Sequence, residues 1–232
     1  MNQGKYEDLG LIDYKEAWDY QEIQFNTIVD TKLHNRENPT DPQPIINKLL
    51  FCEHPHVYTL GKSGEVNNLL INEQFLARIN ATFYKINRGG DITYHGPGQL
   101  VGYPIFDLEQ MNQSVKSYID TLEEAIILTI AEYGIAGSRL PGATGVWLDV
   151  DVPGKARKIC AIGVRASRYV SMHGFALNAN TDLQYFSYIN PCGFIDKGVT
   201  SIKQEIGEEV DMTDLKQKLK LNIQKVFDLQ LY

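Results

Sequence analysis

Hydrophobic residues recur at helical spacing in two segments of the chain, and a third segment has the start signal of a helix. The strongest pattern covers residues 114–133, which predicts a long helix with one buried face. Residues 13–31 form a first predicted helix, because Asp13 and Glu16 have the spacing of a capping box. A last amphipathic helix is predicted over about residues 213–230.

Shorter hydrophobic runs bounded by turn residues predict strands. They cover residues 49–52, 57–60, 82–87, 100–106, 146–150, 159–166 and 169–178. Gly174 interrupts the last run and marks a bulge or a close approach to a ligand. Residues 34–44 contain three prolines and are predicted to form a loop. Because the strands cluster between helices at hairpin-like spacings, we expect an α+β fold.

Composition sets the scale of the molecule. The 232 residues are 43% hydrophobic, which suits one globular domain over residues 1–232 with a substantial core. No run is long or apolar enough to span a bilayer, and the first residues lack an apolar signal region. Three cysteines without regular spacing favour a reducing compartment. We therefore expect a soluble cytoplasmic protein.

Net charge argues against a nucleic-acid binder, because the chain carries −7 and has a pI near 5.3. One local exception is the run 155–168, which contains five basic residues and no acidic one. Two interpretations stay open for this run. It is a strand with solvated basic ends, or it is a docking patch for an acidic partner.

A cysteine and a lysine are the first candidates for chemistry. Cys192 lies among the turn-forming residues Asn190 to Gly193, so its thiol is expected on an accessible loop. Lys158 opens an apolar run that is predicted to be a buried strand. A nearby ammonium group favours the reactive thiolate, so this pair would support thiolate chemistry if the two groups meet in space.

Cys160 is a rival nucleophile. It follows Lys158 by two positions and should face the same side of the strand. It also lies between Ile159 and Ala161 in an apolar run, where a thiol is usually inert packing. Exposure therefore favours Cys192.

The glycine-rich stretch 88–99 is either a long turn between strands or a substrate loop, and we favour the second. Gly89 and Gly90 would let backbone N–H groups approach a ligand closely, and Arg88 and His95 add a fixed cation and a titratable group. His173 is most simply a structural histidine, although a place beside the active site is open.

Two other patterns resemble binding motifs. Gly61-Lys62-Ser63 is similar to the end of a phosphate-binding loop, but His56 stands where that loop needs a glycine. Cys52, His54 and His56 alternate like metal ligands along a strand. Since no second pair of ligands follows, we interpret them as core and turn residues.

Several motifs together resemble the lipoyl(octanoyl) transferases, the octanoyl-[acyl carrier protein]–protein N-octanoyltransferases of lipoate synthesis. The resemblance covers about residues 10–205. The matching stretches are Glu53-His54-Pro55, Tyr58-Thr59-Leu60-Gly61, Arg88-Gly89-Gly90, Thr93 to Leu100, Gly145-Val146-Trp147, Lys158-Ile159, Ala161 to Arg165, His173 to Asn178 and Pro191-Cys192-Gly193. One departure is the segment 150–154, which is longer than the family's usual turn before the lysine.

This resemblance implies a mixed sheet flanked by helices, as in biotin and lipoate protein ligases. It implies Cys192 as the acyl-accepting nucleophile and Lys158 as its partner, with no metal and no cofactor. The implied substrate contacts are Arg88, Gly89, Gly90, Asp91, Ile92, Thr93, Tyr94, His95, Ala161, Ile162, Gly163, Gly174, Phe175 and Ala176.

The implied partners are octanoyl-acyl carrier protein as donor, and apo lipoyl domains of E2 subunits and glycine cleavage H protein as acceptors. Neither a nucleic acid nor a membrane is expected as a partner. Three alternatives remain. An ATP-dependent lipoate or biotin protein ligase would need no cysteine nucleophile, a catalytically inactive protein would only bind acyl groups or carriers, and a cysteine hydrolase would need a histidine base.

Overall fold

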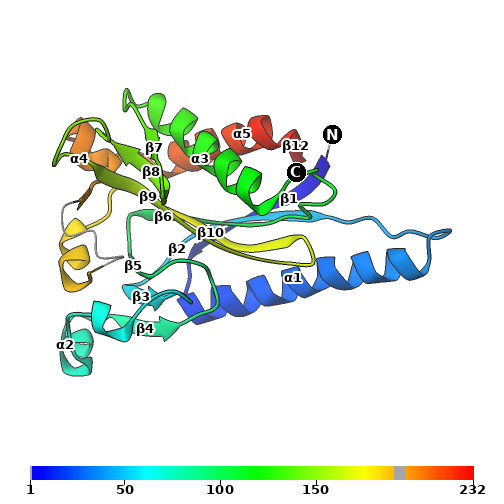
Figure 1. The fold of residues 1–232 in the computed structure, drawn as a ribbon, viewed down its shortest axis with the longest axis horizontal. Coiled ribbons are helices and arrows are strands. Elements are labelled where there is room, and N and C mark those ends of the chain that lie inside the picture. The colour runs from blue at the N-terminus through cyan, green and yellow to red at the C-terminus, as the bar shows by residue number, and fades with distance from the viewer. Residues whose placement is uncertain (1, 191–196) are drawn as a thin grey trace.

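A mixed β-sheet runs through the middle of the molecule, with helices on both faces (Figure 1). The computed structural model describes residues 2–190 and 197–232. The strand order is β12-β1-β2-β6-β10-β9-β8-β7, and β11 pairs with β9. The strands are β1 (Asn2–Leu11), β2 (Asn47–Glu53), β6 (Gln99–Ile105), β7 (Ser138–Leu140), β8 (Ala143–Leu148), β9 (Arg157–Ser167), β10 (Val170–Asn178), β11 (Gly198–Val199) and β12 (Leu229–Leu231).

The strand directions confirm the expected α+β class. β1 is parallel to both β12 and β2, and β11 is parallel to β9. The run from β2 through β6, β10, β9 and β8 to β7 is antiparallel throughout. Antiparallel neighbours joined by short connections account for the hairpin-like spacings in the sequence.

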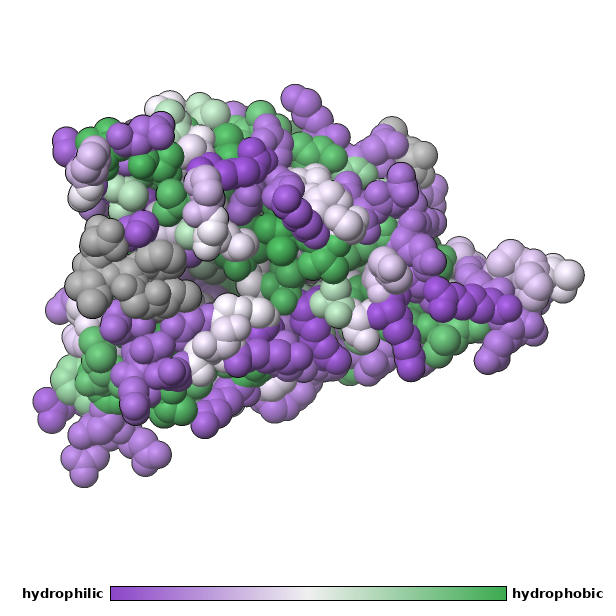
Figure 2. Space-filling model, in the orientation of Figure 1, coloured by the Kyte–Doolittle hydropathy of each residue, from purple (hydrophilic) through white to green (hydrophobic). Residues whose placement is uncertain are grey.

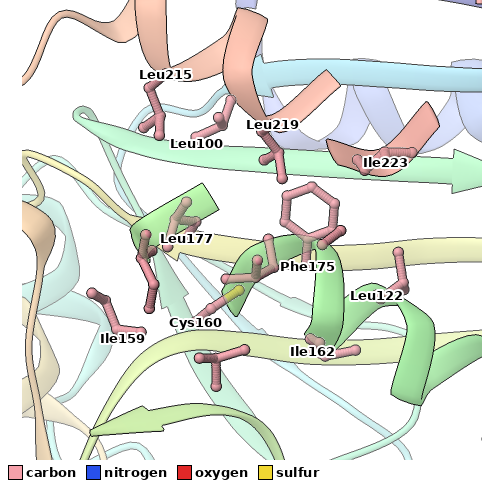
Figure 3. Close-up of a cluster of buried hydrophobic side chains, with 14 of the residues drawn as sticks. Leu100, Leu122, Ile159, Cys160, Ile162, Phe175, Leu177, Leu215, Leu219 and Ile223 are labelled. Atoms are coloured by element: carbon pink, nitrogen blue, oxygen red, sulfur yellow. The ribbon is translucent and has the colours of Figure 1, made fainter. Parts of the chain in front are cut away.

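The first face of the sheet is covered by α3 (Val115–Ala131) and α5 (Met212–Phe227). Ser114 caps α3 by accepting a hydrogen bond from the Ser117 amide, and this start agrees with the predicted helix. Figure 3 shows side chains of both helices pointing onto the sheet around Phe175 and Cys160. This cluster is the larger core of the molecule.

The second face is covered in part by α1 (Tyr14–Glu37), which packs on β10 and β6. The side chain of Asp13 accepts hydrogen bonds from the amides of Lys15 and Glu16, so the predicted start of this helix is confirmed. The helix continues six residues beyond the predicted end at residue 31. It ends only where Pro39 follows Asn38, because a residue that precedes a proline disfavours helical geometry.

A small sheet lies beside α1, with strand order β4 (Thr82–Lys85), β3 (Val57–Leu60) and β5 (Ile92–His95). Strand β5 lies inside the stretch predicted as one continuous turn or loop, so that part of the prediction is wrong. Its residues pair with β3 from Leu60 opposite Ile92 to Val57 opposite His95. The remaining short elements are η1 (Val66–Asn68), α2 (Glu73–Arg78), η2 (Leu183–Tyr188) and α4 (Ile202–Ile206).

Gly174 allows β10 to lie close to β6. A Cβ atom at this position would come 2.2 Å from the carbonyl oxygen of Gly102. The close approach at Gly174 is therefore to the neighbouring strand, whereas the sequence predicted a bulge or a ligand; the same residue also lines the cavity described below.

Figure 2 shows how hydrophilic and hydrophobic residues are distributed over one face of the molecule. Hydrophilic side chains cover much of the outer surface, whereas hydrophobic side chains show in a band between the helical layers. Across residues 2–190 and 197–232, no helix has the length and apolar character needed to cross a membrane.

Candidate active site

A cavity of about 740 Å³ lies on the second face of the large sheet, beyond the part that α1 covers. Its walls come from β5, β6, β8, β9 and β10, from η2 and from the segment around β11. The wall includes the predicted residues Lys158, Arg88, Gly90, Asp91, Ile92, Thr93, His95, Ala161, Ile162, Gly163, Gly174, Phe175 and Ala176. Residues from three separate sequence motifs therefore meet in one cavity.

Two of the predicted substrate contacts, Gly89 and Tyr94, do not line this cavity. The Gly89 amide donates to the Val164 carbonyl oxygen at 2.9 Å, which ties the glycine-rich stretch to β9. The Tyr94 side chain packs in the core of the small sheet, and its hydroxyl lies 2.8 Å from His56 Nδ1. Both residues support the cavity wall from outside.

Lys158 reaches the cavity from β9. Its Nζ donates to the Thr144 carbonyl oxygen at 3.1 Å and lies 4.6 Å from the centre of the Trp147 ring. Both contacts favour a positively charged ammonium group. Gly145 makes room here, since a Cβ atom on it would lie 2.5 Å from the Cys160 carbonyl oxygen, and its φ of +118° is one that glycine adopts readily.

The expectation that Cys160 faces the same side as Lys158 is wrong. Between β8 and β9 the register shifts, with Val146 opposite Cys160 but Trp147 opposite Lys158. The extra residue is Ile159, and this β-bulge turns both Ile159 and Cys160 into the core (Figure 3). Burial raises the pKa of the Cys160 thiol, which keeps it protonated and inert.

Cys192 and its neighbours in residues 191–196 lie outside the described residues. The described residues on either side of this segment, Asn190 and Lys197, both line the cavity. The Asn190 amide donates to the Asn68 carbonyl oxygen at 2.8 Å, and β11 pairs with β9 so that Val199 lies opposite Lys158.

Arg88 is buried at the edge of the cavity and makes mainly internal contacts. Its guanidinium donates to the carbonyl oxygens of Gly89 and Thr59 and to the Thr59 hydroxyl at 2.9, 2.7 and 3.0 Å. The side chain thus fixes the glycine-rich stretch to β3. Burial, with His54 and the Arg88 cation nearby, lowers the pKa of His95 to about 3, so this imidazole is neutral.

His173 also lines the cavity. Its φ of +59° is unusual for a residue with a side chain, and its Nε2 lies 2.8 Å from Asn87 Oδ1. Burial, with Arg88 and Arg165 nearby, lowers its pKa to about 3. A neutral imidazole on the cavity wall adds polarity without charge.

The alternating Cys52, His54 and His56 do not come together as one group of three. His54 Nε2 contacts the Tyr103 hydroxyl at 2.6 Å and lies 3.4 Å from Cys52 Sγ, whereas His56 turns to the small sheet and stacks on Tyr185. In the described part of the chain, no group of three or more His, Cys, Asp or Glu side chains could hold a metal ion.

The basic run 155–168 is spread along β9 and its flanking turns and does not form one patch. An eleven-residue strand spans roughly 35 Å, so the two ends of the run lie far apart. At one end Arg157 forms a bidentate pair with Glu205, and near the other end Arg165 pairs with Glu22 at 3.1 Å. The interpretation as a strand with solvated or paired ends is the better one.

Comparison with known proteins identifies the family. Residues 13–224 match the family model of the lipoyl protein ligase A/B catalytic domain. A protein named octanoyltransferase from Christiangramia forsetii is 58% identical over 97% of this chain and 95% of its own length. A protein of the same name from Flavobacterium johnsoniae is 57% identical over 97% of both chains.

The chain belongs to the octanoyltransferase family. Members of this family are acyltransferases, and the chain is therefore an enzyme of that class. The resemblance inferred from the motifs is confirmed.

Solved structures support the fold of this family. A bipartite lipoate protein ligase from Thermoplasma acidophilum superposes with a TM-score of 0.72 at 13% identity, covering 100% of this chain and 86% of that one. Lipoate-protein ligase A bound with ATP gives 0.68 at 14% identity, covering 100% of this chain and 88% of its own. At these identities the likeness shows that this chain has the fold of those ligases.

The cavity in this octanoyltransferase fold also contains polar residues that were not predicted as site residues. Gln99 and Asn178 line it, and Thr59 supports it from β3. All three stand within the matching motifs, and a polar residue inside an apolar strand run is the signal that could have found them.

Proposed function

We propose that the chain transfers an octanoyl group from octanoyl-acyl carrier protein to a specific lysine of lipoyl domains, through a thioester on Cys192. The acceptors would be E2 subunits and glycine cleavage H protein, and the reaction would be the first step of endogenous lipoate synthesis. The observation that carries the proposal is one cavity lined by Lys158, by most predicted substrate contacts and by Asn190 and Lys197, which flank the cysteine segment.

The first half-reaction is thioester exchange. The Cys192 thiolate attacks the thioester carbonyl of the donor, the bond to the carrier sulfur breaks, and the carrier thiol leaves with a proton. The Lys158 ammonium supports both events, because it stabilises the thiolate and is a suitable proton donor to the leaving sulfur. Its contacts with Thr144 and Trp147 favour this charged state before reaction.

The second half-reaction forms an amide. The neutral amine of the acceptor lysine attacks the Cys192 thioester, the carbon–sulfur bond breaks, and the thiol is restored with a proton that the amine loses. Lys158 is the proposed carrier of that proton. The acyl group arrives activated as a thioester, so neither half-reaction consumes ATP, and no cofactor is required.

The shape of the cavity suits a medium-chain acyl group. Its wall includes the apolar residues Val101, Ala176 and Phe186, together with Tyr103. Burial of an alkyl chain against such a wall is worth about 0.8 kcal/mol per methylene group. The polar groups of the wall, including Arg88 and His95, already have hydrogen-bond partners within the protein. An apolar substrate therefore does not leave them unpaired when it displaces water.

Intact mass spectrometry tests this function. After incubation with octanoyl-acyl carrier protein without ATP, the wild type should gain one octanoyl group, and an apo lipoyl domain should discharge it. The Cys192→Ala variant should gain none. Cys160→Ala is the matched control and should be acylated like the wild type, because the Cys160 side chain is buried in the core.

The result that would contradict the proposal is equally specific. No adduct on the wild type, together with labelling of a lipoyl domain only when free octanoate or lipoate and ATP are present, would assign the chain to ATP-dependent ligation. Stable octanoyl binding without covalent transfer would instead indicate a binding protein.

A further inference from the structure

A continuous row of hydrogen bonds crosses the cavity wall and connects the glycine-rich stretch to β11. The row consists of Arg88, Thr59, His95, Gln99, Asn178 and the carbonyl of Thr200. All six residues are buried, and four of them line the cavity. The proposed reaction assigns no role to Thr59, Gln99 or Asn178.

The direction of each bond follows from the chemistry of the groups. Arg88 has only donors, so its Nη2 donates to the Thr59 hydroxyl at 3.0 Å. The Gln99 amide nitrogen donates to the Tyr94 carbonyl oxygen at 3.2 Å and to Asn178 Oδ1 at 2.9 Å. Its oxygen is therefore the acceptor for His95 Nδ1–H at 2.9 Å.

This assignment fixes the rest of the row. With its proton on Nδ1, the neutral His95 ring accepts at Nε2 from the Thr59 hydroxyl, 3.3 Å away. At the far end Asn178 Nδ2 donates to the Thr200 carbonyl oxygen at 2.9 Å. Every bond then points from the Arg88 cation toward Thr200, an order in which neighbouring bonds strengthen one another.

The end point of the row lies next to the proposed chemistry. The Thr200 amide donates to the Lys158 carbonyl oxygen at 2.9 Å, and β11 directly precedes Thr200. Thr200 is thus held from two sides, by the strand that carries Lys158 and by Asn178. In sequence, β11 begins six residues after Cys192, since 198 − 192 = 6.

We propose that Gln99 and Asn178 are positioning residues, which hold β11 in register with the Lys158 strand and with the Arg88–His95 part of the substrate cavity. The inference rests on the proposed function, because its role is to set the geometry for acyl transfer to Cys192. The row acts as a unit, since each member orients the next one.

The first test compares two buried asparagines. Asn178→Asp keeps the acceptor for Gln99 but loses the donor to Thr200. Asn47→Asp is the matched control, because Asn47 is also buried, accepts from the Asp107 amide and donates to the Gln3 carbonyl oxygen away from the cavity. Only Asn178→Asp should slow octanoyl adduct formation at saturating donor, by about tenfold or more, as expected when a buried group loses its partner.

The second test separates positioning from substrate contact. The Thr59 side chain does not line the cavity, so Thr59→Val interrupts the row without touching the substrate. It should lower the acylation rate constant and change the Michaelis constant for the donor by less than about threefold. The double variant Thr59→Val/Asn178→Asp should lose at least about threefold less than the product of the single losses.

The outcomes distinguish this inference from the proposed function. A wild type that forms no Cys192 adduct would overturn both. A wild type that is acylated normally, with Asn178→Asp behaving like Asn47→Asp or with single losses that simply multiply, would overturn the inference alone. If Asn178→Asp does not yield folded protein, Asn178→Ala, which also loses the donor to Thr200, takes its place in the cycle.

Discussion

The two faces of β10 are built in opposite ways, although the same nine residues supply both. Leu177 points into the core beneath α3 and α5, whereas its neighbours Ala176 and Asn178 line the cavity. The core face is filled by hydrophobic side chains (Figure 3). The cavity face keeps its shape through hydrogen bonds between buried polar groups. Stability and chemistry are thus assigned to alternate positions of one strand.

The largest expected effect on the cavity face comes from Lys158. Lys158→Met retains much of the side-chain volume but removes the charge and the proton donor. Octanoyl adduct formation at saturating donor should slow by about a hundredfold to ten-thousandfold, the range typical of lost general acid–base catalysis. Lys155→Met is the control, because Lys155 is exposed in the preceding turn. Equal rates for both variants would remove Lys158 from the chemistry.

The corresponding effect on the core face is one of stability. Leu177→Ala leaves a cavity in the packed cluster and should lower the free energy of unfolding by about 2–5 kcal/mol. Urea unfolding measures this loss, and the activity per folded molecule should stay near that of the wild type. A variant that unfolds like the wild type but transfers poorly would contradict the division between the two faces.

Acid should lower the free energy of unfolding through three buried histidines that lie outside the α3–α5 core. Burial lowers the pKa of His54 to about 4 and of His95 and His173 to about 3, and none of these imidazoles belongs to the α3–α5 core. In the unfolded chain they take up protons below about pH 6.5, whereas in the folded chain they stay neutral. The free energy of unfolding should therefore fall as the pH drops from about 6.5 toward 4, by about 1.4 kcal/mol per pH unit for each histidine.

Denaturant unfolding across this pH range checks the slope. His95→Gln should make the slope shallower by one histidine's share, and His34→Gln, at an exposed position, is the matched control for the substitution. An identical slope in both variants would mean that His95 does not stay neutral in the folded protein.

The smallest expected effect concerns the length of the acyl chain. Hexanoyl donor lacks two methylene groups, which are worth about 1.6 kcal/mol when buried, so its kcat/KM should be about fifteenfold lower than that of octanoyl donor. Single-turnover acylation with both donors measures the ratio. Equal values would show that the apolar part of the cavity wall does not hold the end of the chain.

Local signals in the sequence were enough to predict the main helices and most central strands. Asp13 caps the first helix as its spacing to Glu16 indicates, the helix predicted from residue 114 begins after Ser114, and the apolar run after Lys158 forms β9. Strand β1 was not predicted, because its sequence is largely polar and it becomes a strand through pairing with β2 and β12. Its stability comes from partners far away in the sequence.

The sequence predicted many residues of the candidate site but not the hydrogen bonds between them. Most of the substrate contacts that the resemblance implied line the cavity, but the bonds that join the wall link residues far apart, such as Gln99 and Asn178. The orientation of Cys160 was predicted wrongly, because strict alternation holds only in a regular strand. Opposite Val146 and Trp147, the additional residue Ile159 reverses the side of the sheet that Cys160 faces. No local sequence pattern indicates this bulge.

That bulge has a consequence for anyone who redesigns this enzyme. Along β10, core positions and cavity positions alternate, so the effect of a substitution on stability should alternate from one residue to the next. Along β9 this alternation should be interrupted at Ile159, because two successive positions between Lys158 and Ala161 face the core. A saturation library that assumes unbroken alternation would randomise Cys160 as if it bordered the substrate. Most of its variants at this position would then disturb the packed core and would not change the cavity.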